Sequence, residues 1–287
     1  MIELGIQGIV LGSLYAIVTV GFALIFGTTR TFHVAHGATY AVAAYVFMQV
    51  VNTTHSPAVG ILASVAIAVL FGLAVDHVLY QPMINRTKSS FLTVFVGSLG
   101  VLIVAENAIG LIWGTTLVSE STPLAMSHAY GSVRLSVIDI LAVGLAVVMF
   151  TGLTIFLRRT TLGRALRAMA NNPELLGLYG WDVAHLRRWS FGIGSALVAP
   201  AAIIAVYTAG ATPTMGESIV YIALAATIVG GVGSLPGAAI SGLILGLATD
   251  LPQAIVGANW GTVIAFGVIL VVLLIRPTGV LSNVARS

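Results

Sequence analysis

The 287-residue sequence contains no cysteine, and only 7% of its residues are charged. The lack of cysteine excludes disulfide bonds, thiol chemistry and zinc sites built on thiolates. A soluble protein carries about 25% charged residues, so this chain cannot cover a globule with polar surface. The sequence also lacks a GxxxxGK[ST] phosphate loop and any recognisable Ser/His/Asp or two-carboxylate arrangement. We therefore expect no catalytic residue, no metal site and no cofactor in this chain.

Apolar residues, in contrast, make up 58% of the chain and raise its mean hydropathy to +1.06. Such a composition needs lipid as its solvent, and a backbone in lipid satisfies its hydrogen bonds within helices. We predict an all-α polytopic transmembrane helical bundle of about 8–9 spans, forming a single domain over residues 1–287. Two of these spans are short and glycine-rich, which favours broken or re-entrant helices over 218–234 and 236–250. The other expected spans are 4–27, 32–51, 57–79, 91–113, 136–157, 189–209 and 258–275.

The basic residues are spread unevenly along the chain. When residues 158–188 are placed in the cytoplasm, eleven of the twelve Lys and Arg residues fall inside and only Arg134 falls outside. This distribution is typical of the positive-inside rule, whereas a nucleic-acid-binding protein would carry a continuous basic stripe. We expect a multi-pass membrane protein with its N-terminus outside, its C-terminus in the cytoplasm and no nucleic-acid partner.

One long polar segment, residues 158–188, interrupts the apolar sequence and holds six of the twelve basic residues. Its pattern predicts a helix up to Ala170, a break at Asn171-Asn172-Pro173, and a second short helix that ends at Gly180. Leucines 175, 176 and 178 and Trp181 give the second helix an apolar surface. Two interpretations stay open: the helix lies on the lipid interface, or it enters a groove of a partner protein.

Four acidic residues lie in or near the ends of apolar runs. Asp76, Asp139 and Asp250 fall close to predicted helix ends, where exposure at the membrane interface explains them. Glu106, followed by Asn107, lies deeper, where a carboxylate costs several kcal/mol unless it faces protein, water or a partner. Glu106 therefore either lines or gates a path, or forms a structural hydrogen bond between helices. If the protein is an ion-driven secondary transporter, Glu106 and Asp250 are the candidate coupling sites.

Three other features have simpler explanations than a ligand site. His33 and His36 lack a third nearby ligand, which favours polar contacts at a helix entry over a metal site. The glycine-rich stretch 230–237 lacks a lysine and a strand context, so we expect a turn between two short helices. The small residues of the stretch 237–246 predict close contact between helix backbones.

The sequence resembles the bacterial branched-chain amino acid ABC transporter permeases of the LivH type. Four stretches in the same order carry the resemblance, which extends over nearly the whole chain. They are FGTTRTFHVAHGATYAVAAYV, RALRAMANNPELLGLYGWDVAHLRRWSF, TPTMGESIVYIALAATIVGGVGSLPGAAISGLILG and IRPTGVL. Departures include His33 where the family usually has Asn, and Ala199-Pro200-Ala201 in place of a Gly-containing run.

The resemblance implies a permease subunit of an ATP-driven importer in the bacterial inner membrane. Its partners would be a second permease subunit (LivM-like, or a second copy), two cytoplasmic ABC ATPases and an extracytoplasmic substrate-binding protein. Branched-chain or related amino acids are the implied substrates, with urea and short amides as alternatives. The implied ATPase-coupling helix comprises Glu174, Leu175, Leu176, Gly180 and Trp181, with Leu-Leu in place of the family's Ala-Ala. Candidate path or gate residues are His36, Glu106 and Asn107.

Overall fold

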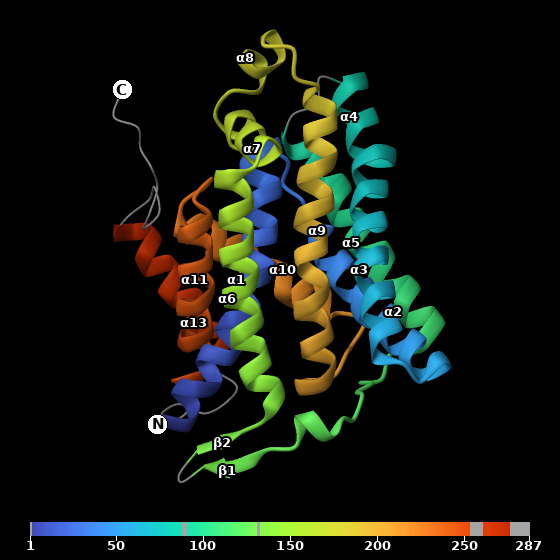
Figure 1. Ribbon diagram of the computed structural model, residues 1–287, viewed down its shortest axis with the longest axis vertical. Coiled ribbons are helices and arrows are strands. Elements are labelled where there is room, and N and C mark those ends of the chain that lie inside the picture. Colours follow the sequence, from blue (N-terminus) through green and yellow to red (C-terminus); the bar gives the residue numbers. More distant parts are fainter. Residues whose placement is uncertain (1, 88–90, 131–132, 253–260, 276–287) are drawn as a thin grey trace.

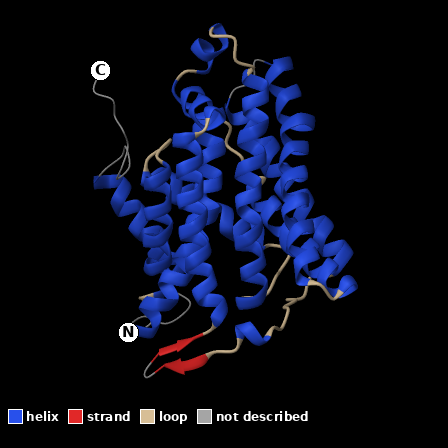
Figure 2. Cartoon of the chain, viewed as in Figure 1, coloured by secondary structure: helices blue, strands red, loops and turns tan. Residues whose placement is uncertain are grey.

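The computed structural model describes residues 2–87, 91–130, 133–252 and 261–275, and it consists almost entirely of helices (Figures 1 and 2). This architecture confirms the all-α membrane bundle. The helices are α1 (Ile2–Thr29), α2 (His36–Thr54), α3 (Pro57–Ala74), the π-helix η1 (Val75–Tyr80), α4 (Gln81–Thr87), α5 (Phe91–Trp113), the 3-10 helix η2 (Pro123–Ala125), α6 (Val137–Arg159), α7 (Thr161–Asn171), α8 (Pro173–Leu178), α9 (Val183–Thr208), α10 (Met215–Gly230), α11 (Leu235–Asp250) and α13 (Gly261–Ile275).

Five helices in the described part of the chain are long and apolar enough to cross a membrane: α1, the continuous α3–η1–α4 helix, α5, α6 and α9. Helices α10 and α11 have 16 residues each, or about 24 Å, which is less than the ~30 Å of a bilayer core. The turn between them contains Gly231 and Gly233, both with positive φ. The expected turn and the expected pair of short helices are thus confirmed.

Helix α1 lies at the centre of the bundle and packs against α11, α9, α10 and α6. Its contact with α11 depends on glycines, because a Cβ atom added at Gly246 would overlap the backbone of Gly12. A Cβ atom at Gly242 would likewise meet the backbone of Ala16. The predicted close approach of helix backbones is therefore confirmed, and its partner is the first helix of the chain.

A Gly246→Ala substitution is expected to destabilise the protein by about 1–3 kcal/mol, because the two helices must separate to admit one methyl group. Thermal unfolding of the purified protein in detergent measures this loss. The matched control is Gly144→Ala on α6, where an added Cβ atom has no neighbour within 4 Å. An equal unfolding temperature for the two variants would contradict the packing role of Gly246.

The connection between α1 and α2 departs from the sequence prediction. A span was expected to begin at residue 32, but residues 30–35 are non-helical and α2 begins at His36. The Nε2 atom of His36 lies 3.2 Å from the carbonyl oxygen of Val18 in α1. Val18 is eleven residues before the end of α1, so α2 begins well inside the bundle. The backbone can leave the helical conformation here because polar side chains of other helices form hydrogen bonds with its free amide groups. Ser98 Oγ, for example, accepts a hydrogen bond from the Ala35 amide at 2.8 Å.

The two ends of the bundle differ in structure. Helices α7 and α8 stand at one end, and the antiparallel hairpin of β1 (His128–Tyr130) and β2 (Val133–Leu135) lies at the other (Figure 1). The hairpin belongs to the segment 114–135, which connects α5 to α6. A backbone bridge between Val118 and Ala211 ties this segment to the chain that enters α10.

Candidate functional site

The polar segment forms the two short helices expected from its sequence. Thr160 caps α7 by accepting a hydrogen bond from the Gly163 amide at 2.9 Å. Asn172 caps α8 in the same way, with its Oδ1 atom 2.9 Å from the Leu175 amide. Pro173 occupies the first turn of α8, where its missing N–H leaves no bond unmade. Both helices and the break between them are thus confirmed.

Helix α7 attaches the segment to the bundle through one apolar face. Ala165, Leu166 and Met169 are buried in a cluster that includes Leu153 and Leu157 of α6. The arginines of α7, Arg164 and Arg167, are exposed. Arg30, which follows α1, also donates a hydrogen bond to the Ala170 carbonyl at 3.0 Å. The segment is therefore fixed to both α1 and α6.

Helix α8 ends in a Schellman motif, which sets the direction of the chain after it. Gly180 has a φ of +83°, and its amide donates to the Gly177 carbonyl at 3.0 Å. The Trp181 amide donates to the Leu176 carbonyl at 3.4 Å, which completes the motif. Leu176 is the buried residue of this helix. A residue without a Cβ atom is needed at position 180, because an L side chain there would be strained.

The outer surface of α8 is apolar and exposed. Leu178 is 84% exposed and Tyr179 is 77% exposed, and Leu175 and Trp181 are exposed beside them. We call these four residues the α8 tip. Glu174 is also exposed and lies in the first turn, where its charge favours the helix dipole. The α8 tip stands beyond the ends of the long helices (Figure 1), so it is available to a partner on that side.

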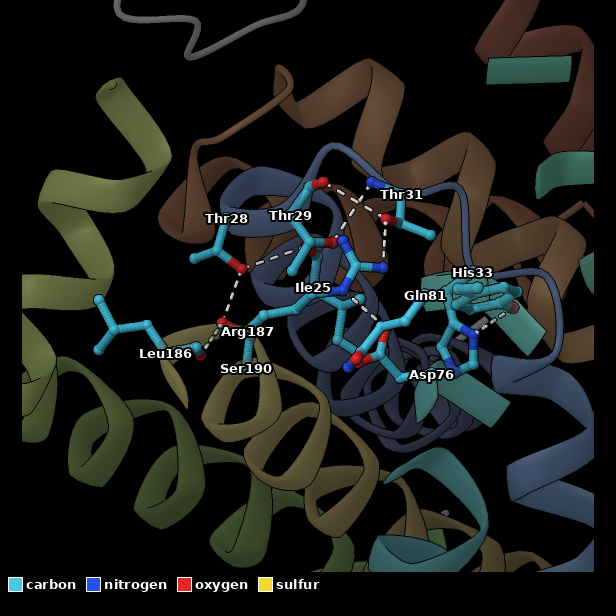
Figure 3. Close-up of polar contacts among 11 residues, drawn as sticks. Ile25, Thr28, Thr29, Thr31, His33, Asp76, Gln81, Leu186, Arg187 and Ser190 are labelled. Carbon is cyan, nitrogen blue, oxygen red and sulfur yellow. Dashed lines mark hydrogen bonds and ion pairs between the residues drawn. The ribbon is translucent and has the colours of Figure 1, made fainter. Parts of the chain in front are cut away.

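A buried ion pair connects the polar segment to the bundle. Nε of Arg187, near the start of α9, donates to Oδ1 of Asp76 at 2.7 Å (Figure 3). Gln81 Nε2 donates to Oδ2 of the same carboxylate at 2.9 Å, and Arg187 Nη2 donates to Thr31 Oγ1 at 3.1 Å. The side chains of Arg187 and Asp76 are 15% and 1% exposed. This pair ties α9 to η1 and to the α1–α2 connection.

The sequence-based interpretation of Asp76 as an exposed interfacial residue is wrong. The helix was expected to end at residue 79, but it continues through η1 and α4 to Thr87, which leaves Asp76 inside the protein. The sequence also provided no indication that Arg187, unlike the other arginines of the segment, forms a buried ion pair. A signal was present, since a carboxylate within an apolar helix requires a cationic or hydrogen-bonding partner.

A second chain of hydrogen bonds continues from η1 to the start of α2. The Tyr80 hydroxyl donates to Ser98 Oγ at 2.7 Å and lies 2.8 Å from Nδ1 of His33. Ser98 in turn accepts from the amide of Ala35. The histidine pair therefore makes polar contacts at a helix entry, as expected, and no group of three or more His, Cys, Asp or Glu suitable for a metal occurs among the described residues.

The candidate path residues lie around the point where α2 and α10 begin. A Cβ atom at Gly37 would overlap the backbone of Gly216, so the two helix N-termini are in close contact. Glu106 of α5 accepts a hydrogen bond from the Glu217 amide at 2.9 Å, so its carboxylate lies at the positive end of the α10 dipole. His36 is buried beside α1.

Asn107 differs from the other two path candidates. It is exposed on the outer face of α5 and donates a hydrogen bond to the Ile103 carbonyl of the preceding turn at 2.8 Å. The structure therefore gives Glu106 an interhelical hydrogen bond and places both His36 and Glu106 next to the α2–α10 contact. A role for any of the three residues in a transport path stays a prediction.

Asp139 and Asp250 lie at the opposite end of the bundle from α8. Asp139 forms a capping box with Ser136 at the start of α6. Both carboxylates line a polar cavity of about 520 Å³ together with Glu3, Arg134 and Tyr207. Their position near helix ends agrees with the sequence-based interpretation.

The comparisons with known proteins agree with this architecture. Residues 5–273 match the model of the family described as the permease component of branched-chain amino acid transport systems. The chain is 29% identical to the high-affinity branched-chain amino acid transport system permease protein BraD of Pseudomonas aeruginosa, over 97% of this chain and 94% of that protein. It is 28% identical to LivH of Escherichia coli, over 96% of this chain and 94% of that protein.

A solved structure also has a similar fold. It is PsaBC from Streptococcus pneumoniae in complex with Fab, which aligns with a TM-score of 0.53 at 13% identity, over 96% of this chain and 91% of that chain. At this identity the similarity concerns the fold alone.

Proposed function

Because the chain belongs to the family of permease components of branched-chain amino acid transport systems, we propose that it is the membrane-spanning permease subunit of an ABC importer. In this function it forms the translocation path for branched-chain or related amino acids. It performs no chemistry itself, since ATP is hydrolysed on other subunits. The relatives BraD and LivH, which match along nearly their whole length, support this function.

The observation that carries the coupling role is the exposed α8 tip on a firmly attached base. Leu178 and Tyr179 are exposed next to Leu175 and Trp181, and a contiguous apolar patch of this kind marks an interaction site. The buried face of α7 attaches the segment to the bundle. A helix end of this kind fits a groove on a cytoplasmic ATPase. Glu174, Leu175, Leu176, Gly180 and Trp181 form the coupling helix in this proposal, with Leu176 as its buried anchor.

The proposed assembly contains a second permease subunit, or a second copy of this chain, two ABC ATPases and an extracytoplasmic binding protein. The α8 end faces the cytoplasm of a bacterial inner membrane, and the end with the β1–β2 hairpin faces outside. This orientation is supported by the arginines of the polar segment, which gather at the α8 end. With this orientation the N-terminal end of α1 lies outside. The cytoplasmic C-terminus expected from the sequence lies beyond the described residues and stays a prediction.

In this proposal, the movement that produces alternating access begins when the ATPases displace the α8 tip. It is transmitted through the bundle to the N-terminal ends of α2 and α10. Arg187 transfers motion to η1 through Asp76 and to the α1–α2 connection through Thr31. The contact of Gly37 with Gly216, flanked by His36 and Glu106, is the point where small helix shifts change the path. Asn107 faces outward and fits the boundary with the second permease subunit.

Reconstitution tests the function directly. Proteoliposomes that contain this chain, its ATPases and the binding protein are expected to accumulate leucine, isoleucine or valine only when ATP is present inside. Proteoliposomes with this chain alone are expected to show no uptake under a proton or sodium gradient. Gradient-driven uptake by the chain alone would contradict the proposal and identify a secondary transporter.

A further inference from the structure

A groove on the outer surface of the bundle has a lining that the proposed transport function does not use. It runs between α3 and α9, has a volume of about 460 Å³, and is named here the α3–α9 groove. Its apolar part is formed by Val69, Leu73, Gly192, Ile193 and Ala196. Its remaining lining residues are His185, Arg188 and Trp189, all in the first two turns of α9.

The polar and apolar parts of the groove are separated along the membrane normal. Ala196 follows Arg188 by eight residues, which corresponds to about 12 Å along the helix. Arg188 and His185 lie at the α8 end, where the long helices leave the membrane, and the apolar residues extend toward the bilayer centre. Trp189 stands at the boundary, the position that tryptophan prefers at membrane interfaces. The surface of the groove itself is almost entirely apolar, and the exposed Arg188 and His185 lie beside its α8 end. This order matches an acyl chain followed by a phosphate headgroup.

The charge of the polar end is positive and unmatched within the described chain. The ion pair of Arg187 with Asp76 is the one salt bridge among the described residues, so Arg188 has no acidic partner there. Trp189 Nε1 donates to His185 Nε2 at 2.9 Å, which makes Nε2 the acceptor and leaves the proton of the neutral ring on Nδ1. Arg188 and His185, both exposed, therefore carry hydrogen-bond donors beside the α8 end of the groove, within reach of an anion there.

The apolar end of the groove contains unfilled space because residue 192 is glycine. A Cβ atom at Gly192 would meet only Val69 Cγ1, at 4.0 Å. Gly192 is not required by backbone contact, unlike the glycines of the α1–α11 crossing, and its effect is to leave space within the groove. From the unmatched Arg188, the donor on His185 and this apolar channel, we infer that the α3–α9 groove binds an anionic phospholipid, with its phosphate at Arg188 and an acyl chain along Gly192 and Ile193.

Native mass spectrometry of the full-length protein, titrated with phosphatidylglycerol or phosphatidylcholine of identical acyl chains, tests this inference. The unsubstituted protein is expected to bind phosphatidylglycerol about tenfold more tightly, the ratio expected for one charge-assisted hydrogen-bonded contact. Arg188→Gln is expected to lower phosphatidylglycerol binding to the phosphatidylcholine level. Gly192→Leu, which fills the groove, is expected to weaken the binding of both lipids.

Two matched variants control for general effects of charge and side-chain size. Arg164→Gln removes an exposed arginine of α7, and Gly152→Leu enlarges a residue of α6 whose added Cβ has no neighbour within 4 Å. Both are expected to bind lipids as the unsubstituted protein does. If Gly192→Leu folds poorly, Arg188→Gln decides the question alone, because Arg188 makes no ion pair among the described residues.

Two results would overturn the inference. One is an unchanged preference for phosphatidylglycerol in Arg188→Gln. The other is efficient cross-linking of an Ile193→Cys variant to another subunit in the assembled transporter, which would show that a protein covers the groove. Neither experiment measures transport activity, so either the lipid site or the proposed function can be refuted without refuting the other.

Discussion

A Gly180→Val variant is expected to reach the membrane at the normal level and to lose ATP-driven uptake by about tenfold or more. Gly180 has a φ of +83°, a conformation that costs an L residue roughly 1–2 kcal/mol and is worse for a β-branched side chain. The chain can relieve this strain only by giving up the Schellman motif, which moves Trp181 away from Leu176. If this strain destabilises the docked state by about 1.4 kcal/mol, the population of that state falls tenfold.

Uptake and ATP hydrolysis are measured side by side in proteoliposomes for this prediction. If α8 transmits force, ATP hydrolysis continues in Gly180→Val while uptake falls, because the ATPases are then uncoupled from the path. Glu174→Gln is expected to act in the same direction with a smaller effect, since it removes only a charge in the first turn of α8. Full uptake in Gly180→Val would count strongly against a coupling role for this helix.

The matched control for Gly180→Val lies three residues earlier, within α8. Gly177 has no left-handed backbone conformation, and an added Cβ atom would meet only Val183 Cγ2, at 3.9 Å. Gly177→Ala is therefore expected to keep uptake near the level of the unsubstituted protein. The comparison separates the geometry of the helix end from a general sensitivity of α8 to substitution.

Removal of Arg187 is expected to have the largest effect on stability. An Arg187→Met variant leaves the Asp76 carboxylate buried without its cation, a change that typically costs about 3–5 kcal/mol. A loss of this size should lower the unfolding temperature by roughly 10 °C in a protein of this length. Thermal unfolding in detergent, followed by the fraction of protein that stays monodisperse, provides the measurement.

A double variant identifies the cause of the loss. In Arg187→Met with Asp76→Asn, no unpaired charge remains, and the Gln81 side chain can still donate a hydrogen bond to residue 76. We expect this double variant to recover most of the lost stability. Arg188→Met is the control, because this neighbouring arginine is exposed. Equal stability of Arg187→Met and the unsubstituted protein would show that the ion pair contributes little.

Much of the polar segment was predictable because its signals are local. Proline in a first helical turn, glycine at a helix end and apolar residues at helical spacing act over three or four residues. The structure therefore reproduces the expected α7, the break at Asn172 and α8, which is followed by Gly180 in the left-handed conformation. The bounds of both short helices therefore follow from the sequence to within a residue or two.

The polar interior was less predictable because its partners are distant in the sequence. Asp76 and Arg187 are 111 residues apart, as are Glu106 and Glu217. Hydropathy treats each apolar run separately, so it assigned Asp76 to an exposed helix end and began α2 four residues early. No local pattern reveals that Tyr80 and Ser98 of other helices support the non-helical residues 30–35.

By itself the sequence determined the membrane class, the approximate spans, the family resemblance and the two short helices of the polar segment, since composition and short-range spacing control these features. Only the tertiary structure decided which polar groups are buried, which carboxylate pairs with Arg187, and where the helix N-termini of α2 and α10 meet. The physical reason is that burying a charge in an apolar protein requires a partner, and the fold alone brings that partner close enough to bond.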